Sequence, residues 1–133
     1  VIGGATVPWR LKSWLVDMFG PAVSEAYGST IAGLIALMPS SEIKSRRGSC
    51  GRPIPGAIVE IRDSNGQRLP PGAVGHVWAR TQRTLECEFE GRDQLPRDAD
   101  GFIPTGHAGS IDADGFIYLS GRSADIFEAI KAG

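Results

Sequence analysis

The sequence predicts an α/β unit followed by a mainly antiparallel β unit within one chain of 133 residues. Residues 1–47 combine short apolar runs with one segment of helical periodicity. From residue 48 onward, glycine and proline recur every few residues and separate short β-prone runs, a pattern typical of antiparallel sheets. The third observation is size, because a chain this short buries roughly two thirds of its unfolded surface and supports one modest core.

Within residues 1–47, the sequence predicts a strand end, a helix and a second strand. Four apolar residues repeat at the spacing of one helix face: Leu11, Trp14, Leu15 and Met18. A helix is therefore expected over residues 8–19, and the Gly-Pro pair that follows should end it. Residues 22–27 should then form a strand that delivers Gly28 at its carboxyl end, where open α/β sheets place their ligands.

The second unit is predicted as a series of short strands joined by turns. Residues 57–62 alternate in polarity with the period of a half-buried strand, and Asn65-Gly66 supplies a hairpin turn. Further elements follow in order: strands at 73–81 and 85–89, a surface loop at 91–101, a closing hairpin over 102–119 and a short helix at 123–131.

Charge and composition argue against several classes of protein. The 14 basic and 15 acidic side chains give a net charge of -1, which provides no field to attract nucleic acid or an anionic membrane. The basic run at residues 44–47 is interpreted as a solvated connector. Cys50 and Cys87 follow no metal-binding or redox spacing, so free thiols, no metal site and a cytoplasmic location are expected.

Four groups of short motifs stand out by their order and spacing along the chain. They are Tyr27-Gly28-Ser29-Thr30, Gly51-Arg52-Pro53 with Pro55-Gly56, Thr105-Gly106-His107, and Gly121-Arg122. In the first, two hydroxyls and the backbone amides of a glycine turn can bind phosphate without a charged side chain. Taken singly, such a motif is more often an ordinary turn than a binding site.

Taken together, the motifs resemble those of the adenylate-forming superfamily, which includes acyl-CoA synthetases, luciferases and peptide-synthetase adenylation domains. The resemblance runs from Gly3 to Arg122, and residues 47–53 are most similar to acyl-CoA synthetases. It implies an internal fragment of the large domain that ends at the hinge. The parts would be a partial α/β subdomain with an AMP-binding turn at 1–47, a distorted antiparallel β-barrel at 48–122 and a hinge region at 123–133.

The resemblance also implies an AMP-binding site. Its cofactor-binding residues would be Gly4, Ala5, Tyr27, Gly28, Ser29, Thr30, His107 and Arg122. In that family pattern Tyr27 stacks on or flanks the adenine, Thr30 contacts the α-phosphate as the candidate catalytic residue, and Arg122 reaches the ribose and phosphate. Gly4 and Ala5 would pack against the other face of the base. Standing alone, Arg122 is equally well explained as a surface arginine paired with an acidic neighbour.

Two positions depart from the family pattern. Ile31 stands where the family usually has a glutamate that helps to hold Mg²⁺, and its aliphatic side chain offers no oxygen ligand. His107 stands where an aspartate accepts hydrogen bonds from both ribose hydroxyls, so ribose binding is expected to weaken by about 1–3 kcal/mol. A catalytic role for His107 is not favoured, because the sequence places no nucleophile or carboxylate to form a relay with it.

The reaction implied by the resemblance is activation of a carboxylic acid by ATP as acyl-AMP, followed by transfer of the acyl group to CoA, as in fatty acid metabolism. The expected partners are therefore the acid, ATP and CoA, with Mg²⁺ expected for the parent enzyme. The family's phosphate loop and adenylating lysine fall outside these residues, so the chain alone is expected to be inactive. Two alternatives stay open: a catalytically degenerate pseudo-ligase that acts as a scaffold or interaction module, and a peptide-synthetase adenylation domain.

Overall fold

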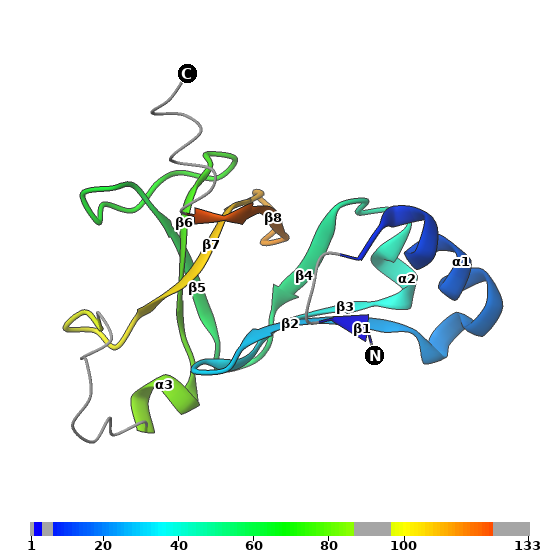
Figure 1. The fold of residues 1–133 in the computed structure, drawn as a ribbon, viewed down its shortest axis with the longest axis horizontal. Helices are drawn as coiled ribbons and strands as arrows, with labels where there is room; N and C mark the ends of the chain where they lie inside the picture. The colour runs from blue at the N-terminus through cyan, green and yellow to red at the C-terminus, as the bar shows by residue number, and fades with distance from the viewer. Residues whose placement is uncertain (1, 4–6, 87–96, 124–133) are drawn as a thin grey trace.

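The computed structural model describes residues 2–3, 7–86 and 97–123, and their strands form one sheet (Figure 1). Eight strands follow the spatial order β1-β2-β3-β4-β8-β7-β6-β5. In chain order the strands are β1 (Ile2–Gly3), β2 (Ser24–Ser29), β3 (Gly33–Pro39), β4 (Ser49–Pro53), β5 (Ile58–Arg62), β6 (Gly75–Arg80), β7 (Ile103–Ile111) and β8 (Ile117–Arg122). The helices are α1 (Trp9–Phe19), the 3₁₀ turn η1 (Gly20–Ala22), α2 (Ser40–Ile43) and α3 (Gln82–Glu86).

The sheet is mainly antiparallel and remains open. Only β1 and β2 pair in parallel, while the other pairs of neighbouring strands run antiparallel. A barrel of residues 48–122 would close by pairing of β4 with β5, whereas β4 pairs with β3 and β8 and β5 pairs with β6. The expectation of a barrel at residues 48–122 is therefore wrong insofar as it implies closure among the described residues.

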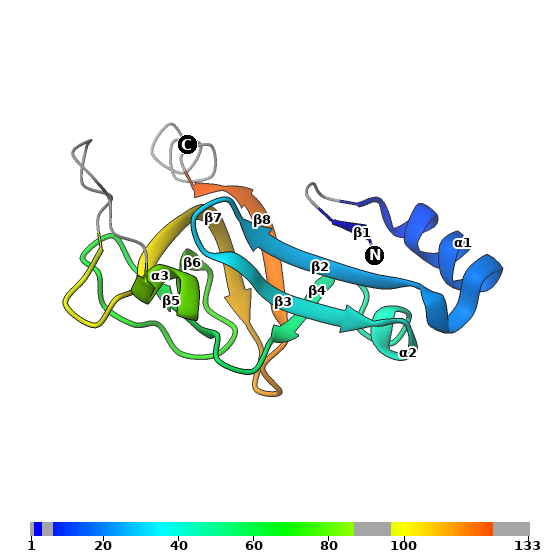
Figure 2. The same cartoon turned by 90° about the horizontal axis from the view of Figure 1, so that it is seen from below.

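β4 joins the two halves of the molecule. It pairs with β3 on one side and with β8 on the other, so the sheet turns from the β1–β3 half into the β5–β8 half at this strand. Figures 1 and 2 show α1 and α2 grouped with the first half, at the end of the molecule away from β5, β6 and β7.

The predicted helix is confirmed, but its buried side differs from the expected one. α1 begins at Trp9 and ends before Gly20, as the Gly-Pro signal indicated. Leu15 packs against the core, whereas the side chains of Leu11, Trp14 and Met18 are 46%, 53% and 60% exposed. The helical periodicity therefore predicted the position of the helix but not its buried side. Trp9, Leu15 and Val16 are the apolar residues of α1 that pack against the core.

Two apolar clusters form the core. The larger one lies under β3 and the β5–β8 half: Tyr27, Ala32, Ile35, Ala36, Cys50, Val59, Ile61, Val77, Ala79, Ile103 and Ile117. The smaller one lies between the helices and the sheet: Val23, Met38, Ile43 and Phe116. β3 contributes to both, because Ile35 and Met38 point into different clusters. This strand and α2 were absent from the sequence prediction.

Most predicted strands of the second half are confirmed with shifted ends. The strand expected at 57–62 is β5, the one at 73–81 is β6, and the closing hairpin is β7 and β8. The weaker strand expected at 85–89 is wrong where it can be compared, because residues 82–86 form α3. The rest of that strand, most of the predicted loop at 91–101 and nearly all of the helix at 123–131 lie outside the described residues.

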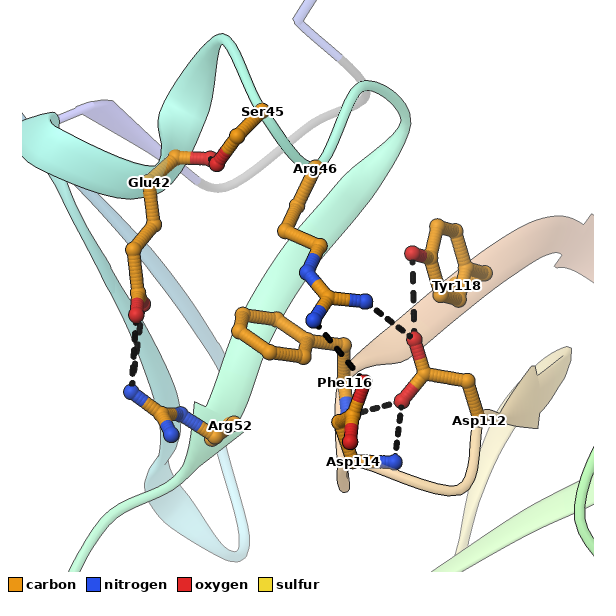
Figure 3. A network of polar contacts seen from close by, with 8 residues as sticks. All are labelled: Glu42, Ser45, Arg46, Arg52, Asp112, Asp114, Phe116 and Tyr118. Atoms are coloured by element: carbon orange, nitrogen blue, oxygen red, sulfur yellow. Dashed lines mark hydrogen bonds and ion pairs between the residues drawn. The ribbon is translucent and has the colours of Figure 1, made fainter.

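A polar cluster ties the loop before β4 to the turn between β7 and β8 (Figure 3). The Arg46 guanidinium lies 2.8 Å from an oxygen of Asp114 and 3.4 Å from one of Asp112, and its carbon lies 4.3 Å from the centroid of the Phe116 ring. The Tyr118 hydroxyl donates to the same Asp112 oxygen at 3.2 Å. Arg46 is thus half-buried and connects the two halves of the sheet through its ion pairs. The interpretation of residues 44–47 as a solvated connector does not hold for this residue.

Candidate functional site

One cavity gathers residues from both halves of the sheet. It opens to solvent and has a volume of about 110 Å³. Three of its lining residues, Tyr27, Gly28 and His107, belong to the predicted AMP-binding set.

Tyr27 lies on β2 with its side chain buried against the second half of the sheet. Its hydroxyl lies 3.0 Å from Nδ1 of His107, and the two rings meet edge to face with their centroids 5.6 Å apart. Burial raises the pKa of the Tyr27 phenol to about 12, against an opposing hydrogen bond from Thr105. The phenol is therefore protonated at neutral pH, and the tautomer of His107 decides which of the two groups donates in their contact.

His107 lies on β7, directly opposite Arg122 of β8 in the strand register. The ring is half-buried. Burial lowers the pKa of His107 below its usual 6.5, and the positive charge of Arg122 lowers it further. At neutral pH the imidazole is consequently uncharged, so it presents one donor and one acceptor.

Lys12 and Glu25 form a buried ion pair in the wall of the same cavity. Their charged atoms are 2.6 Å apart, and each residue is only 6% exposed. Lys12 comes from α1 and Glu25 from β2, so the pair fixes the helix to the strand that carries Tyr27. Sequence reasoning missed both residues; the available signal was a glutamate two positions before Tyr27, inside an otherwise small and apolar strand.

Cys50 lines the cavity as an inert thiol. The residue is free and buried. Burial raises the pKa of its thiol to about 12, and the negative charge of Glu25 adds to this shift. The thiolate, which is the nucleophilic form, is thus scarcely populated at neutral pH. Cys87, the other expected free thiol, lies outside the described residues.

The hydroxyl turn after Tyr27 contributes one residue to the cavity wall. Gly28 lines it, and a Cβ atom at this position would meet the carbonyl oxygen of Gly33 at 2.4 Å, so only glycine fits. The Ser29 hydroxyl accepts a hydrogen bond from the Ala32 amide at 2.9 Å and holds the turn into β3. Thr30 is exposed and does not line the cavity.

The remaining predicted residues lie at the end of β8 or outside the described chain. Gly121 lines the cavity, but Arg122 is exposed and does not. Gly4 and Ala5 lie outside the described residues, although the nearby Val7 contributes to the cavity wall. The structure therefore brings together the β2 and β7 positions of the predicted set and leaves Thr30 and Arg122 beyond the wall.

The described residues do not fit a magnesium site. Ile31 is half-buried and packs against the larger apolar cluster, so no oxygen ligand stands at the position where the family has a carboxylate. Within residues 2–3, 7–86 and 97–123, no three His, Cys, Asp or Glu side chains come together as metal ligands.

The side-chain hydrogen bond of His107 within the described part of the chain is with Tyr27. None of the described helices has the length and apolar character needed to cross a membrane.

Comparison with known proteins places these features in a family. The family model described as AMP-binding enzyme matches residues 1–87. Human acyl-coenzyme A synthetase ACSM6, a mitochondrial protein, is 32% identical over 138 residues, which cover 96% of this chain and 28% of the synthetase.

Two solved structures share the fold. The amide bond synthetase McbA from Marinactinospora thermotolerans matches with a TM-score of 0.77 and 32% identity, covering 90% of this chain and 25% of that one. The o-succinylbenzoate coenzyme A synthetase MenE from Bacillus subtilis, solved in complex with AMP, matches with a TM-score of 0.80 and 25% identity over 92% of this chain and 26% of that one. MenE has also been solved with ATP and a magnesium ion.

The chain thus spans about a quarter of the length of these relatives. The match covers the strand and turn that carry Tyr27 and Gly28, and the aligned structures reach across most of the chain. This chain belongs to the AMP-binding enzyme family, the adenylate-forming superfamily, and is acyl-CoA ligase-like.

Proposed function

We propose that the cavity beside Tyr27 and His107 binds the adenosine part of ATP and AMP in an acid-thiol ligase. The single observation that carries this proposal is the meeting of two motif residues, 80 positions apart in sequence, in one hydrogen bond on a shared cavity wall. Gly28 and Gly121, which belong to two of the four motif groups, line the same cavity. Membership of the AMP-binding family supports an adenine nucleotide as the ligand.

Within this proposal each side chain has a defined task. Tyr27 supplies an aromatic edge for the base, and Gly28 lets the backbone come close to the nucleotide. Thr30 follows Gly28 by two positions and Arg122 follows Gly121 by one, so their exposed side chains would meet the phosphates where these leave the cavity. A fixed guanidinium can bind phosphate oxygens in a fork.

The reaction proposed for the whole ligase is the attack of a substrate carboxylate oxygen on the α-phosphorus of ATP. The bond between the α-phosphorus and the bridging oxygen breaks, and pyrophosphate leaves with the electron pair. The acyl-AMP then passes its acyl group to the thiol of CoA, and AMP is released. This chain would contribute nucleotide binding, and we expect it to catalyse neither step alone, because no cluster of lysine and arginine side chains lines the cavity among the described residues to receive the leaving pyrophosphate.

The proposal is tested by measuring AMP binding to the chain with isothermal titration calorimetry. Ala26→Leu fills the cavity wall beside Tyr27 and should weaken AMP binding at least about tenfold, because added side-chain volume excludes the ligand. Ala57→Leu is the matched control, since Ala57 lines a different surface hollow. Absence of AMP binding to the unsubstituted chain, or equal weakening by both substitutions, would contradict the proposal.

A degenerate pseudo-ligase is the second candidate, and Ile31 is the observation that favours it. The half-buried aliphatic side chain at this position removes a carboxylate ligand for Mg²⁺. The two candidates differ in the longer polypeptide, where acid-dependent exchange of labelled pyrophosphate into ATP reports adenylation. Exchange that rises in the double variant Ile31→Glu with His107→Asp would favour a weakened ligase, whereas no exchange in either protein would favour a scaffold.

The identity of the acceptor and the cellular location stay predictions. CoA is proposed because residues 47–53 are most similar to acyl-CoA synthetases. McbA is named as an amide bond synthetase, so the fold is also compatible with a nitrogen acceptor. A cytoplasmic location rests on the spacing of the two cysteines in the sequence, while ACSM6 is mitochondrial by its name.

A further inference from the structure

One hexapeptide, Asp-Ala-Asp-Gly-Phe-Ile, occurs twice in the chain, at residues 98–103 and 112–117, and forms the same turn each time. In both copies Oδ1 of the first aspartate accepts hydrogen bonds from the amides two and four residues later, at 2.9 or 3.0 Å. The glycine of each copy has a positive φ, +89° at Gly101 and +87° at Gly115. Because sequence and backbone geometry agree, a difference in strength between the copies must come from the groups that hold them.

The first copy is held by a buried arginine. Arg62 of β5 lies 2.7 Å from Oδ2 of Asp98, and its guanidinium carbon lies 5.0 Å from the centroid of the Phe102 ring. The side chain of Arg62 is 11% exposed and that of Asp98 is 24% exposed. Water and salt reach this ion pair poorly, so we expect it to persist when the ionic strength rises.

The second copy is held by Arg46, which comes from the loop before β4 (Figure 3). The guanidinium lies 3.4 Å from Oδ2 of Asp112 and 2.8 Å from an oxygen of Asp114, and the three side chains are 28% to 64% exposed. Ion pairs with this much contact with water contribute little to stability and are screened by salt. The same turn is therefore held firmly in its first copy and weakly, in a salt-dependent way, in its second.

The weaker contact spans the seam between the two halves of the sheet, by which we mean the pairing of β4 with β8. Two residue pairs make this seam, Ser49 with Tyr118 and Gly51 with Ile117, and the register shifts between them. The Ser49 hydroxyl adds one bond to the Ile117 carbonyl. The neighbouring pairing of β7 with β8 contains five residue pairs. A short ladder of this kind can open locally at a lower free-energy cost than global unfolding.

The cavity lies across this seam. Gly48, just before β4, and Cys50 within β4 line the cavity from one side. Leu119 and Gly121 of β8 line it from the other side. Separation of the two strands would therefore widen the cavity and uncover the Cys50 thiol, because this residue is only 6% exposed while the strands are paired.

We propose that Arg46 is a salt-sensitive latch on the cavity. Its ion pairs with the turn at residues 112–117 keep the seam closed, and their loss lets the seam open locally and admits small molecules. The turn at residues 98–103 stays in place during this opening, because its arginine is buried. The latch controls access whatever the cavity binds, so this inference goes beyond the proposed function and does not rest on it.

The inference is tested by the rate at which N-ethylmaleimide labels the Cys50 thiol under native conditions. Cys87 lies outside the described residues and is replaced by serine, so that one thiol reports. Mass spectrometry follows the labelled fraction with time. A buried thiol reacts from the open state, so the rate is proportional to the population of that state when opening is fast. The reagent is uncharged, which keeps salt from changing its encounter with the protein.

Arg46→Gln should raise the labelling rate about three- to tenfold, as the loss of one or two exposed ion pairs implies. A rise in NaCl from about 0.05 M to about 0.5 M should raise the rate about two- to fivefold in the protein with Arg46 and scarcely in the variant. Lys44→Gln is the matched control, because the exposed ion pair of Lys44 with Asp17 lies away from the seam. An unchanged rate in Arg46→Gln, or an equal rise in Lys44→Gln, would overturn the inference.

Arg62→Gln distinguishes the latch from a general loss of stability. This change should lower the urea midpoint, because it leaves two largely buried carboxylates without their partner. Its labelling rate should rise no more than the fall in global stability implies. Arg46→Gln should instead raise the labelling rate while the urea midpoint barely moves. If the labelling rates of both variants follow their unfolding free energies alone, Cys50 is uncovered only by global unfolding, and the inference is overturned.

Discussion

At the scale of single residues, Gly51 is the tightest point of the fold. It lies on β4 with φ +106°, and a Cβ atom there would meet the Leu37 carbonyl oxygen at 2.1 Å and its carbon at 2.3 Å. β4 can therefore cross from one half of the sheet to the other only where no side chain separates it from β3. The position of β4 therefore also sets the position of one cavity residue, because Cys50 of the same strand lines the cavity wall.

Gly51→Ala is expected to lower the free energy of unfolding by at least about 2 kcal/mol, because it adds backbone strain to a steric clash. Gly56→Ala serves as the control, since Gly56 also has a positive φ, +87°, but its Cβ would meet nothing within 4 Å. That variant should lose only about 1 kcal/mol. Urea denaturation measures both, and equal losses would show that packing against Leu37 is not the cause.

His107 should make stability depend on pH in a defined window. Its pKa is lowered in the folded state below the usual 6.5, first by burial and then by Arg122. Below 6.5 the unfolded chain therefore binds more protons than the folded one, so stability is constant above this pH and falls as the pH drops below it. Urea midpoints should show this fall, and His107→Gln should flatten it. An unchanged slope in the variant would assign the pH dependence to another group.

The Asp112 carboxyl group, whose pKa is lowered in the folded state, affects stability at lower pH than His107 does. Burial alone would raise the pKa of Asp112, but hydrogen bonds from the Phe116 and Asp114 amides lower it below 3.8. Its stabilising contribution is complete above 3.8 and is lost as the pH falls through the lower folded value. The histidine and carboxylate effects are thus separable in one titration.

Individual site residues were partly predictable from the sequence. Tyr27, Gly28 and His107 each sit in a motif with a fixed place in the order of the chain, and they line one cavity, while their role in binding stays a prediction. Lys12 and Glu25 were missed, because no local pattern reveals which lysine will be buried by a strand 13 positions away. Thr30 and Arg122 belong to motifs too, yet their side chains lie outside the wall, since a motif specifies neighbours along the chain and leaves side-chain direction open.

At the scale of elements, the attachment of α1 to β2 depends on one buried ion pair. Lys12 and Glu25 are joined at 2.6 Å, and the glutamate oxygen in this contact has no hydrogen bond within the described part of the chain. Removing two charges from water is costly, so such a pair orients elements more than it stabilises them. The orientation matters here because β2 carries Tyr27.

Lys12→Met alone is expected to cost about 3–5 kcal/mol, because it leaves a buried carboxylate without its partner. The double variant Lys12→Met with Glu25→Leu should recover most of that loss, since an apolar pair of similar volume suffers no desolvation. Equilibrium urea denaturation of the unsubstituted protein, the two single variants and the double variant gives the coupling free energy between the two side chains. Additive losses would contradict a direct interaction between the two side chains.

Helices and strands were predictable from the sequence where polar and apolar residues repeat with one clear period. α1, β5, β6 and the closing hairpin were anticipated because each has a clear periodicity and a glycine or proline at its boundary. β3 was missed, because its run from Gly33 to Pro39 is almost entirely apolar and shows no alternation of polar and apolar residues, although Leu34 and Leu37 are exposed. α1 carries apolar residues on two faces, so periodicity alone did not tell which one meets the sheet.

At the scale of the whole molecule, β4 and a buried serine hold the two halves together. The Ser49 hydroxyl donates to the Ile117 carbonyl of β8 at 2.8 Å and accepts from the Gly51 amide at 3.0 Å. Ser49 is 2% exposed, so neither partner can exchange this bond for one with water. The Arg46 cluster supports the same joint from the surface (Figure 3).

Ser49→Ala is expected to lower the free energy of unfolding by about 1–3 kcal/mol, because a buried carbonyl and a buried amide both lose their partner. Ser45→Ala is the control, since the Ser45 hydroxyl is exposed and contacts only the Glu42 carbonyl at 3.2 Å. If the contacts between β4 and β8 couple the two halves of the sheet, thermal unfolding should remain a single transition in both variants. Two separate transitions in the unsubstituted chain would contradict that coupling.

The topology of the whole sheet was the least predictable level. The sheet is mainly antiparallel as expected, but the expected barrel did not close, because closure depends on pairing between strands that are distant in the order. Local spacing of glycine and proline fixes turns and says little about pairing between distant strands. The pairing of β4 with β8, some 68 positions apart, is such a contact.

The open end of the sheet at β5 carries a hazard for work with the protein at high concentration. Ile58 on this strand is 43% exposed, and the strand order stops here. The following segment covers part of this edge, because the Leu69 amide donates to the Ile61 carbonyl at 2.7 Å, and the remainder beside Ile58 is a template on which further copies can add, a route toward fibrous aggregates. A charged gatekeeper residue in place of Ile58 is accordingly the first change to make when this chain is to be kept in concentrated solution.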